Sequence, residues 1–354
     1  MTHCCTDPVR GAGIAKGAGC CIGSHPWSGL PCAVPLTTED LNALWSASGV
    51  GLTWSSPFVL PPWLTYWWKT FGAGQEFLLW EIRHGDQLLG IAPLRVAGDT
   101  ARFMGSVDLC DYQDFVVMPG LERQFFWALL HLLKQRGVSG LDLSGLRPDS
   151  AAMLALPAAA ETQGSGIVWE QQDVSYELAL PSSWGAFLSG LSGKERHEIQ
   201  RKFRRLNQSL SYRLEVIETP PEVDAAMDEF VHLFKMSRPE KVAFLSEARE
   251  DFIRRVSRSL AERGLVKLYF LRAGGSRVAS ALCFDMNDSV YLYNSGMDPH
   301  YRDLSVGLLC KLLTLRRSLE TGRRTYDFLK GAETYKARLG ARPVPLYRCR
   351  LSLG

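Results

Sequence analysis

Apolar residues in the first half of the chain recur with helical spacing in some stretches and with the two-residue spacing of strands in others. The pattern begins at residue 36. It predicts helices at 41–45, 61–68 and 123–135, and strands at 77–83, 87–94, 101–104, 114–118, 141–145 and 174–180. Pro181-Ser182-Ser183 then interrupts the pattern and marks a predicted domain boundary.

The second half shows a similar order of elements. Its pattern predicts helices at 223–234, 244–263, 306–319 and 333–339, and strands at 265–272, 277–285, 289–294, 324–329 and 346–351. Residues 84–93 and 274–283 share a polar turn followed by apolar and small residues, and each leads into strand, loop, long helix and strand. This internal repeat indicates a tandem duplication and predicts an α/β protein of two similar domains.

Composition and charge narrow the function classes. The 354 residues suit two domains of ordinary size, and 40 basic against 37 acidic side chains predict no partner from global charge. No apolar run is long enough to span a membrane, and the glycine-rich N-terminus does not resemble a secretory signal, so we expect a cytoplasmic protein. Five cysteines lie within the first 32 residues without zinc-ligand spacing, so no metal is expected. Residues 1–35 are predicted to be a disordered tail.

A polar loop directly precedes the predicted helix at 306–319. Its sequence is Arg302-Asp303-Leu304-Ser305-Val306-Gly307. Main-chain amides at a helix N-terminus bind phosphates, and the missing side chain of Gly307 permits close approach. The alternative interpretation is an ordinary loop in which Ser305 caps the helix.

The elements from residue 265 onward resemble the GNAT acyltransferase core, in which an Arg/Gln-x-x-Gly-x-Gly/Ala loop precedes a helix. The match here is Arg302-x-x-Ser305-x-Gly307, with Ser305 where a glycine is usual. The resemblance implies an α/β fold of two tandem GNAT-like domains, at 36–180 and 181–354, with acyl-CoA bound by residues 302–307 of the second. The loop Met118-Pro-Gly-Leu-Glu-Arg123 lacks the motif, so the first domain is expected to bind no donor.

A narrower resemblance concerns three other segments. Residues 326–336, the segment 54–58 with its neighbouring tryptophans, and residues 191–196 are similar to the CelD/BcsL group of cellulose-biosynthesis acetyltransferases. That likeness implies acyl transfer to an amine or hydroxyl of a saccharide or cell-surface precursor. Two alternatives are a Fem-type transferase using aminoacyl-tRNA and a non-catalytic saccharide-binding or assembly protein.

The resemblance also implies catalytic residues. Tyr335-x-x-x-x-Gly340 resembles the GNAT segment whose tyrosine protonates the departing thiolate, a step suited to a phenol that keeps its proton at neutral pH. Tyr335 could instead anchor its helix by its ring. Glu333, Asp285 and Asp298 are candidate general bases.

Residues 194–205 form a basic cluster with six Lys or Arg side chains against two Glu. Lys194, Arg196 and Arg201, together with Lys336, are candidate ligands of an anionic acceptor or of the CoA 3′-phosphate. The alternative is a solvated helix. No stacking aromatics interrupt the charges, so no specific nucleic acid is expected. Trp63, Trp67 and Trp68 are expected in the core rather than in a carbohydrate groove, and the sequence does not predict an oligomeric state.

Overall fold

The computed structural model describes residues 30–47 and 51–354. The elements of the first half are, in chain order, β1 (Pro31–Pro35), α1 (Thr38–Ser46), η1 (Pro57–Val59), α2 (Pro61–Phe71), β2 (Glu76–His84), β3 (Gln87–Ala97), β4 (Thr100–Phe103), β5 (Val116–Val117), α3 (Glu122–Gln135), β6 (Gly140–Leu146), α4 (Ala151–Thr162) and β7 (Ile167–Ala179).

The second half is richer in helices. Its elements are α5 (Trp184–Gly190), α6 (Gly193–Ser209), β8 (Tyr212–Ile217), α7 (Pro220–Ser237), α8 (Pro239–Phe244), α9 (Glu247–Ala261), β9 (Val266–Ala273), β10 (Ser276–Met286), β11 (Ser289–Met297), η2 (Pro299–Leu304), α10 (Val306–Glu320), β12 (Thr325–Lys330), α11 (Thr334–Arg338) and β13 (Arg342–Ser352).

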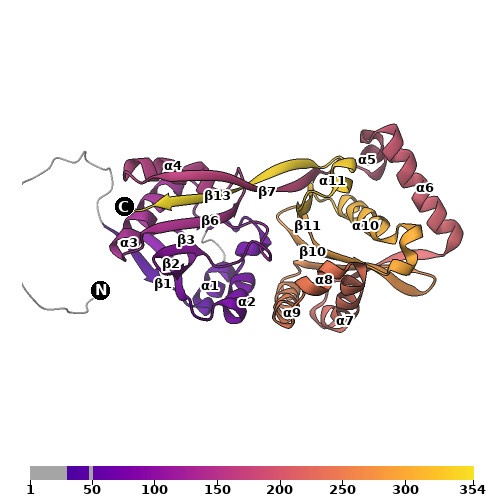
Figure 1. Ribbon diagram of the computed structural model, residues 1–354, viewed down its shortest axis with the longest axis horizontal. Coiled ribbons are helices and arrows are strands. Elements are labelled where there is room, and N and C mark those ends of the chain that lie inside the picture. Colours follow the sequence, from indigo (N-terminus) through magenta and orange to yellow (C-terminus); the bar gives the residue numbers. More distant parts are fainter. Residues whose placement is uncertain (1–29, 48–50) are drawn as a thin grey trace, which may run out of the picture.

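The strands form one mixed sheet that runs through both halves of the molecule (Figure 1). Their order is β1-β2-β3-β4-β6-β13-β7-β12-β11-β10-β9-β8, and β5 adds to β3. Helices pack against the sheet in each half, with α3 and α4 in the first and α7, α9 and α10 in the second. This arrangement confirms the predicted α/β class.

Strand β13 belongs to the second half in sequence but lies within the sheet of the first half. It pairs antiparallel with β6 on one side and β7 on the other, from Arg342 opposite Glu177 to Leu351 opposite Ile167. Its residues Cys349 and Leu351 are buried in the core of the first half. The sheet therefore continues without interruption past the predicted boundary after residue 180, and Figure 1 shows β7 and β13 spanning both halves.

A second apolar core joins the two halves. Trp63 of α2 is completely buried and meets Phe252 of α9 and Phe284 of β10 edge to face, at ring-centroid distances of 5.3 and 5.6 Å. Trp67 is also buried, and Trp68 packs partly buried against the same core. The tryptophans thus occupy the core, as the sequence predicted, because a large aromatic surface is most stable out of water.

The internal repeat corresponds to two β-hairpins, β2–β3 and β9–β10. Gly85 in the first turn has φ 57°, and Gly274 and Gly275 in the second have φ 59° and 88°. These left-handed conformations suit glycine, which explains the polar turns that the repeat places there.

Three predictions of secondary structure need correction. The helix expected at 244–263 corresponds to α9 and begins at Glu247, because Ser246 caps it with its side chain; α8, which ends at Phe244, was not predicted. The pattern analysis did not identify α4, which is rich in alanine and contains Pro157, or the strands β1 and β8. The disordered tail was predicted to extend to residue 35, but residues 31–35 form strand β1, which pairs with β2. Residues 1–29 of that tail lie outside the described part of the chain.

None of the helices in the described residues is long and apolar enough to cross a membrane.

Candidate active site

A cavity opens in the second half where two parallel strands separate. Strands β11 and β12 pair only over Ser289–Tyr291 and Thr325–Asp327. Beyond that point the strands diverge, and a cavity of about 440 Å³ forms between their C-terminal ends. Its wall includes residues 292–297 of β11, residues 328–330 of β12, and residues from α7, α8, α10 and α11. Diverging strands free main-chain polar groups that a ligand can bind.

Helix α10 begins at this cavity. Ser305 precedes it with φ 56° and ψ 33°, the left-handed region that favours glycine. The serine therefore adopts a turn that glycine adopts more easily. The Ser305 side chain makes no capping hydrogen bond; its Oγ accepts one from Lys202 Nζ at 2.9 Å. The capping interpretation of Ser305 is therefore wrong.

Gly307 lies in the first turn of α10 and lines the cavity. A Cβ atom at this position would come within 2.8 Å of Met297 Sδ, so the missing side chain lets Met297 pack directly against the start of α10. The other predicted donor-site residues differ in exposure. Arg302 and Asp303 are exposed, Leu304 is half-buried, and Val306 is buried. Of the six predicted residues, Gly307 is the one that lines the cavity wall.

Tyr335 and Glu333 come together on the opposite wall, at the start of α11. The Tyr335 ring lies 6.0 Å from the ring of Phe328, and Lys311 Nζ of α10 lies 4.5 Å from its centroid. Burial and the nearby charge of Glu333 raise the pKa of Tyr335, so its hydroxyl keeps its proton at neutral pH. Burial alone would raise the pKa of Glu333, but the ammonium of Lys336 holds it below its ordinary value.

Lys336 is buried within the protein. Its Nζ donates to the main-chain oxygens of Leu329, Lys330 and Gly331 at 2.8–3.1 Å and forms an ion pair with Glu333 at 2.8 Å. These contacts use all three donors of an ammonium group. They hold the end of β12 against α11, where Leu329 has the unusual φ of 57°.

Asp285 lies away from the cavity. It is buried near the C-terminal end of β10, opposite Val290 at the start of β11, and its carboxylate binds Arg323 at 2.8 and 3.0 Å. Asp298 accepts hydrogen bonds from the main chain and ring of His300. The structure therefore brings Tyr335, Glu333 and Gly307 together and places Asp285 elsewhere.

Helix α6, which carries the predicted basic cluster, lies beside α10 and η2 (Figure 1). Lys194 is exposed and Arg196 half-buried, and Arg201 binds Glu198 within the helix at 2.8 Å. Lys202, which the sequence did not single out, is the α6 side chain that contacts the loop before α10.

This combination of diverging parallel strands, a left-handed turn and a helix start at the cavity agrees with a comparison to protein families. Residues 193–337 match the acetyltransferase (GNAT) domain family. The matched region begins at α6, ends in α11 and contains the cavity walls except for Asp108 and Asp111 of the first half.

Solved structures extend the likeness to both halves. The crystal structure of FemX has a TM-score of 0.61 at 10% sequence identity, covering 89% of this chain and 96% of that one. A conserved protein of unknown function from Bacteroides thetaiotaomicron has a TM-score of 0.54 at 11% identity, covering 90% and 99%. At such identities the likeness establishes the fold, and it confirms the predicted GNAT-like α/β architecture. No curated protein matches the chain.

Two lysines of the second half were missed by the sequence analysis. Lys241 of α8 and Lys311 of α10 both line the cavity. Burial, together with the charges of neighbouring cations, lowers the pKa of Lys241 to about 7. Burial likewise lowers the pKa of Lys311 to about 8. Lys311 lies four residues after Gly307, so helical spacing could have identified it; Lys241 reaches the cavity through tertiary packing alone.

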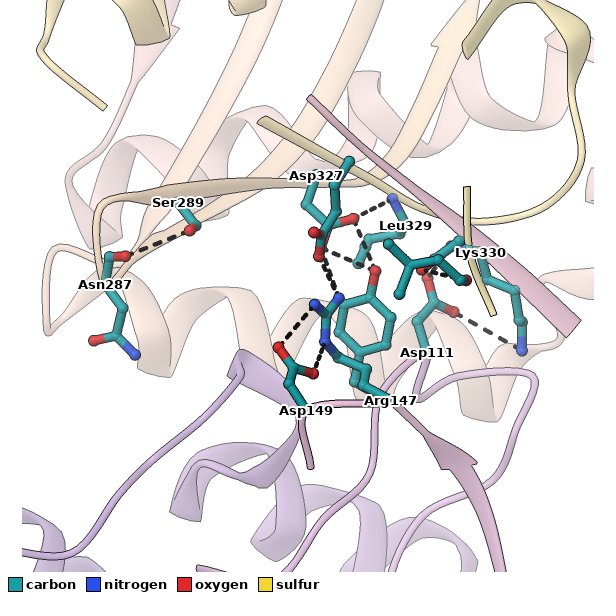
Figure 2. A network of polar contacts seen from close by, with 12 residues as sticks. Asp111, Arg147, Asp149, Asn287, Ser289, Asp327, Leu329 and Lys330 are labelled. Carbon is teal, nitrogen blue, oxygen red and sulfur yellow. Dashed lines mark hydrogen bonds and ion pairs between the residues drawn. The ribbon is translucent and has the colours of Figure 1, made fainter. Parts of the chain in front are cut away.

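A polar network connects the second half with the first half (Figure 2). The carboxylate of Asp327, at the end of the paired part of β12, accepts hydrogen bonds from the Tyr112 hydroxyl at 2.8 and 2.9 Å and from the Leu329 amide at 2.7 Å. Arg147 lies 3.9 Å from Asp327 and also binds Asp149. Burial, and secondarily the charge of Glu177, raise the pKa of Asp327.

Within the described residues, no group of three or more His, Cys, Asp or Glu side chains is arranged to hold a metal ion.

Proposed function

We propose that this protein transfers an acyl group, with acetyl as the first candidate, from acyl-CoA to an amine or hydroxyl of a saccharide or cell-surface precursor. The observation that carries the proposal is that Gly307 of α10 and Tyr335 of α11 line one cavity within the region that matches the GNAT domain.

The donor side of the cavity suits a pyrophosphate. The N-terminus of the fifteen-residue helix α10 carries partial positive charge, and its first main-chain amides have no acceptor within the helix. Gly307 has no side chain and packs closely against Met297, and the ammonium of Lys202 reaches the adjoining Ser305. Acyl-CoA would supply the acyl group as a thioester.

The opposite wall supplies a proton donor. Tyr335 keeps its hydroxyl proton because its pKa is raised, and it can give that proton to the departing thiolate. Glu333 is ionised, since Lys336 lowers its pKa, and its carboxylate can accept the proton that the acceptor loses on attack. General acid or base groups of this kind contribute about 10²–10⁴-fold to a rate.

The test combines binding and turnover. Acetyl-CoA is expected to raise the melting temperature of the purified protein. Thiol release from acetyl-CoA, followed across a panel of amines, hydroxyl compounds and amino sugars, is expected to identify the acceptor. Acyl-CoA binding without turnover on any acceptor would favour a saccharide-binding or assembly protein. No acyl-CoA binding, with transfer from aminoacyl-tRNA instead, would favour a Fem-type transferase.

A further inference from the structure

Three cations meet in the cavity without a carboxylate partner. Arg238 lies between α7 and α8, Lys241 one turn later on α8, and Lys311 faces them from α10. Lys241 Nζ donates to the main-chain oxygen of Ser295 and lies 4.5 Å from the ring centroid of Phe234. Lys311 Nζ lies at the same distance from the ring of Tyr335. Among the described residues, none supplies an ion pair to these three side chains.

The acidic residues of the cavity are mostly engaged with other cations. Asp108 binds Arg249, Asp111 lies 3.9 Å from Lys330, and Glu333 binds Lys336 at 2.8 Å. Glu240 is exposed at the edge. The cavity therefore holds a positive corner of three side chains that form no ion pair among the described residues, with Glu333, the partner of Lys336, as the nearby carboxylate.

This corner is electrostatically unfavourable when no anion is bound. Burial is the main cause that lowers the pKa of Lys241, and repulsion from Lys311 and Arg238 lowers it further. The charge of Glu333 raises this pKa in part. Burial also lowers the pKa of Lys311, and so do the charges of Arg238 and Lys336. The charge of Glu333 raises it. A bound anion would restore the charged state of both amines, because an opposite charge favours the ionised form.

We propose that Arg238, Lys241 and Lys311 bind a carboxylate of the substrate. Lys311 contacts the ring of Tyr335, the residue placed at the thioester, so the anion would lie beside the reacting atoms and not at the phosphates near the start of α10. The carboxylate has two possible carriers: a dicarboxylic acyl group on the donor, or an acceptor such as an amino acid or acidic sugar. Deciding which molecule carries the carboxylate depends on the proposed function. The binding of an anion at these three side chains does not.

Matched ligands distinguish the two carriers. On the donor side, succinyl-CoA would bind at least about tenfold more tightly than acetyl-CoA, a preference that charge-assisted hydrogen bonds can supply. On the acceptor side, glycine would have a KM at least about tenfold below that of glycinamide. Lys241→Met and Lys311→Met should remove whichever preference exists, while Lys134→Met, in the first half, should retain it.

The deciding experiment uses the wild-type protein and needs no turnover. Acetic anhydride labels neutral amines, and mass spectrometry measures the labelling rate of each lysine at about pH 8. Saturating succinate should slow labelling of Lys241 at least about tenfold, since raising its pKa by two units lowers the neutral fraction by that factor. Succinamide should give no protection, and Lys134 and Lys267 serve as internal controls.

Equal labelling with and without succinate, at every concentration up to the solubility limit, would overturn the anion site. Protection by succinamide as well as succinate would also overturn it, because the contact would then not depend on charge. Protection by succinate in a protein whose melting temperature acetyl-CoA leaves unchanged would retain the site and reject the proposed acyl-CoA function.

Discussion

The two halves of the molecule contain the same kind of strand divergence, and they use it differently. In the first half, the parallel strands β4 and β6 pair only at Thr100 and Ala101 with Gly140 and Leu141. In the second half, β11 and β12 likewise separate after three pairs. Each half also contains a hairpin and a helix packed on the sheet next to the divergence. The repeat in the sequence therefore corresponds to a repeat of architecture.

Aromatic rings fill the first half. Phe103, Phe115, Phe125 and Phe126 are buried, with neighbouring ring centroids at 4.9–5.5 Å. The second half has the cavity lined by lysines and tyrosines in the corresponding region. Four buried rings provide apolar stabilisation to this half.

The helices next to the divergence start differently. The second residue of α10 is Gly307, and the second residue of α3 is Arg123. Leu121 precedes α3 with φ −109°, whereas Ser305 precedes α10 with φ 56°. The two halves thus share a fold but differ at the helix start. Residues 122–124 of α3 line a cavity of about 600 Å³ in the first half, and Gly307 of α10 lines the cavity of the second.

The largest expected effect comes from making α10 resemble α3. Gly307→Arg should abolish the rise in melting temperature caused by acetyl-CoA, because the side chain would occupy the space against Met297. Differential scanning fluorimetry measures the shift. The control Arg123→Gly, at the matching position of the first half, should leave the shift unchanged. An intact shift in Gly307→Arg would remove α10 as the donor site.

Tyr335→Phe tests the opposite wall of the cavity. The variant keeps the ring and its contact with Lys311 but loses the hydroxyl, so kcat should fall by roughly ten- to a thousandfold while affinity for acyl-CoA stays nearly constant. Steady-state thiol release and a binding titration measure the two quantities. Wild-type kcat would assign Tyr335 to packing.

Lys336→Met tests whether this buried lysine positions the wall. Methionine fills a similar volume but leaves three main-chain oxygens and Glu333 without their donor. The free energy of unfolding should fall by about 1–3 kcal/mol, as for other buried polar groups that lose a partner. Urea denaturation gives the value. Lys134→Met, on the surface of the first half, should change it by less than about 0.5 kcal/mol. An equally small change in Lys336→Met would contradict the positioning role.

Asp327→Asn should have the smallest effect, visible as a change in pH dependence. In the folded protein the raised pKa keeps Asp327 protonated where the unfolded chain, with an ordinary pKa of 3.8, has lost the proton. Unfolding then releases a proton, so stability contributed by this group falls as pH rises from about 4 toward the raised pKa. Asn cannot titrate, and the variant should show a flatter profile of urea midpoint against pH. An unchanged profile would show that Asp327 is ionised in the folded protein.

Much of the site could be predicted because its signals are local. The start of α10 at Gly307 follows from a polar loop before an apolar helix, whereas Tyr335 was proposed because its segment resembles one of the GNAT core. Lys241 could not be predicted, because its contact with the cavity depends on Ser295, 54 residues away. The hydrogen bond between Tyr112 and Asp327 joins residues 215 apart, and no sequence period records such a pairing.

Strand β13 has a consequence for the order in which the molecule is built. Synthesis proceeds from the N-terminus, so β6 and β7 emerge from the ribosome long before residues 342–352, which lie between them in the sheet. Until then those two strands have edges without their neighbour, and the core lacks Cys349 and Leu351. Strands that are far apart in the sequence pair slowly, and unpaired strand edges favour aggregation. The first half must therefore wait, incompletely folded, for the second half to be synthesised.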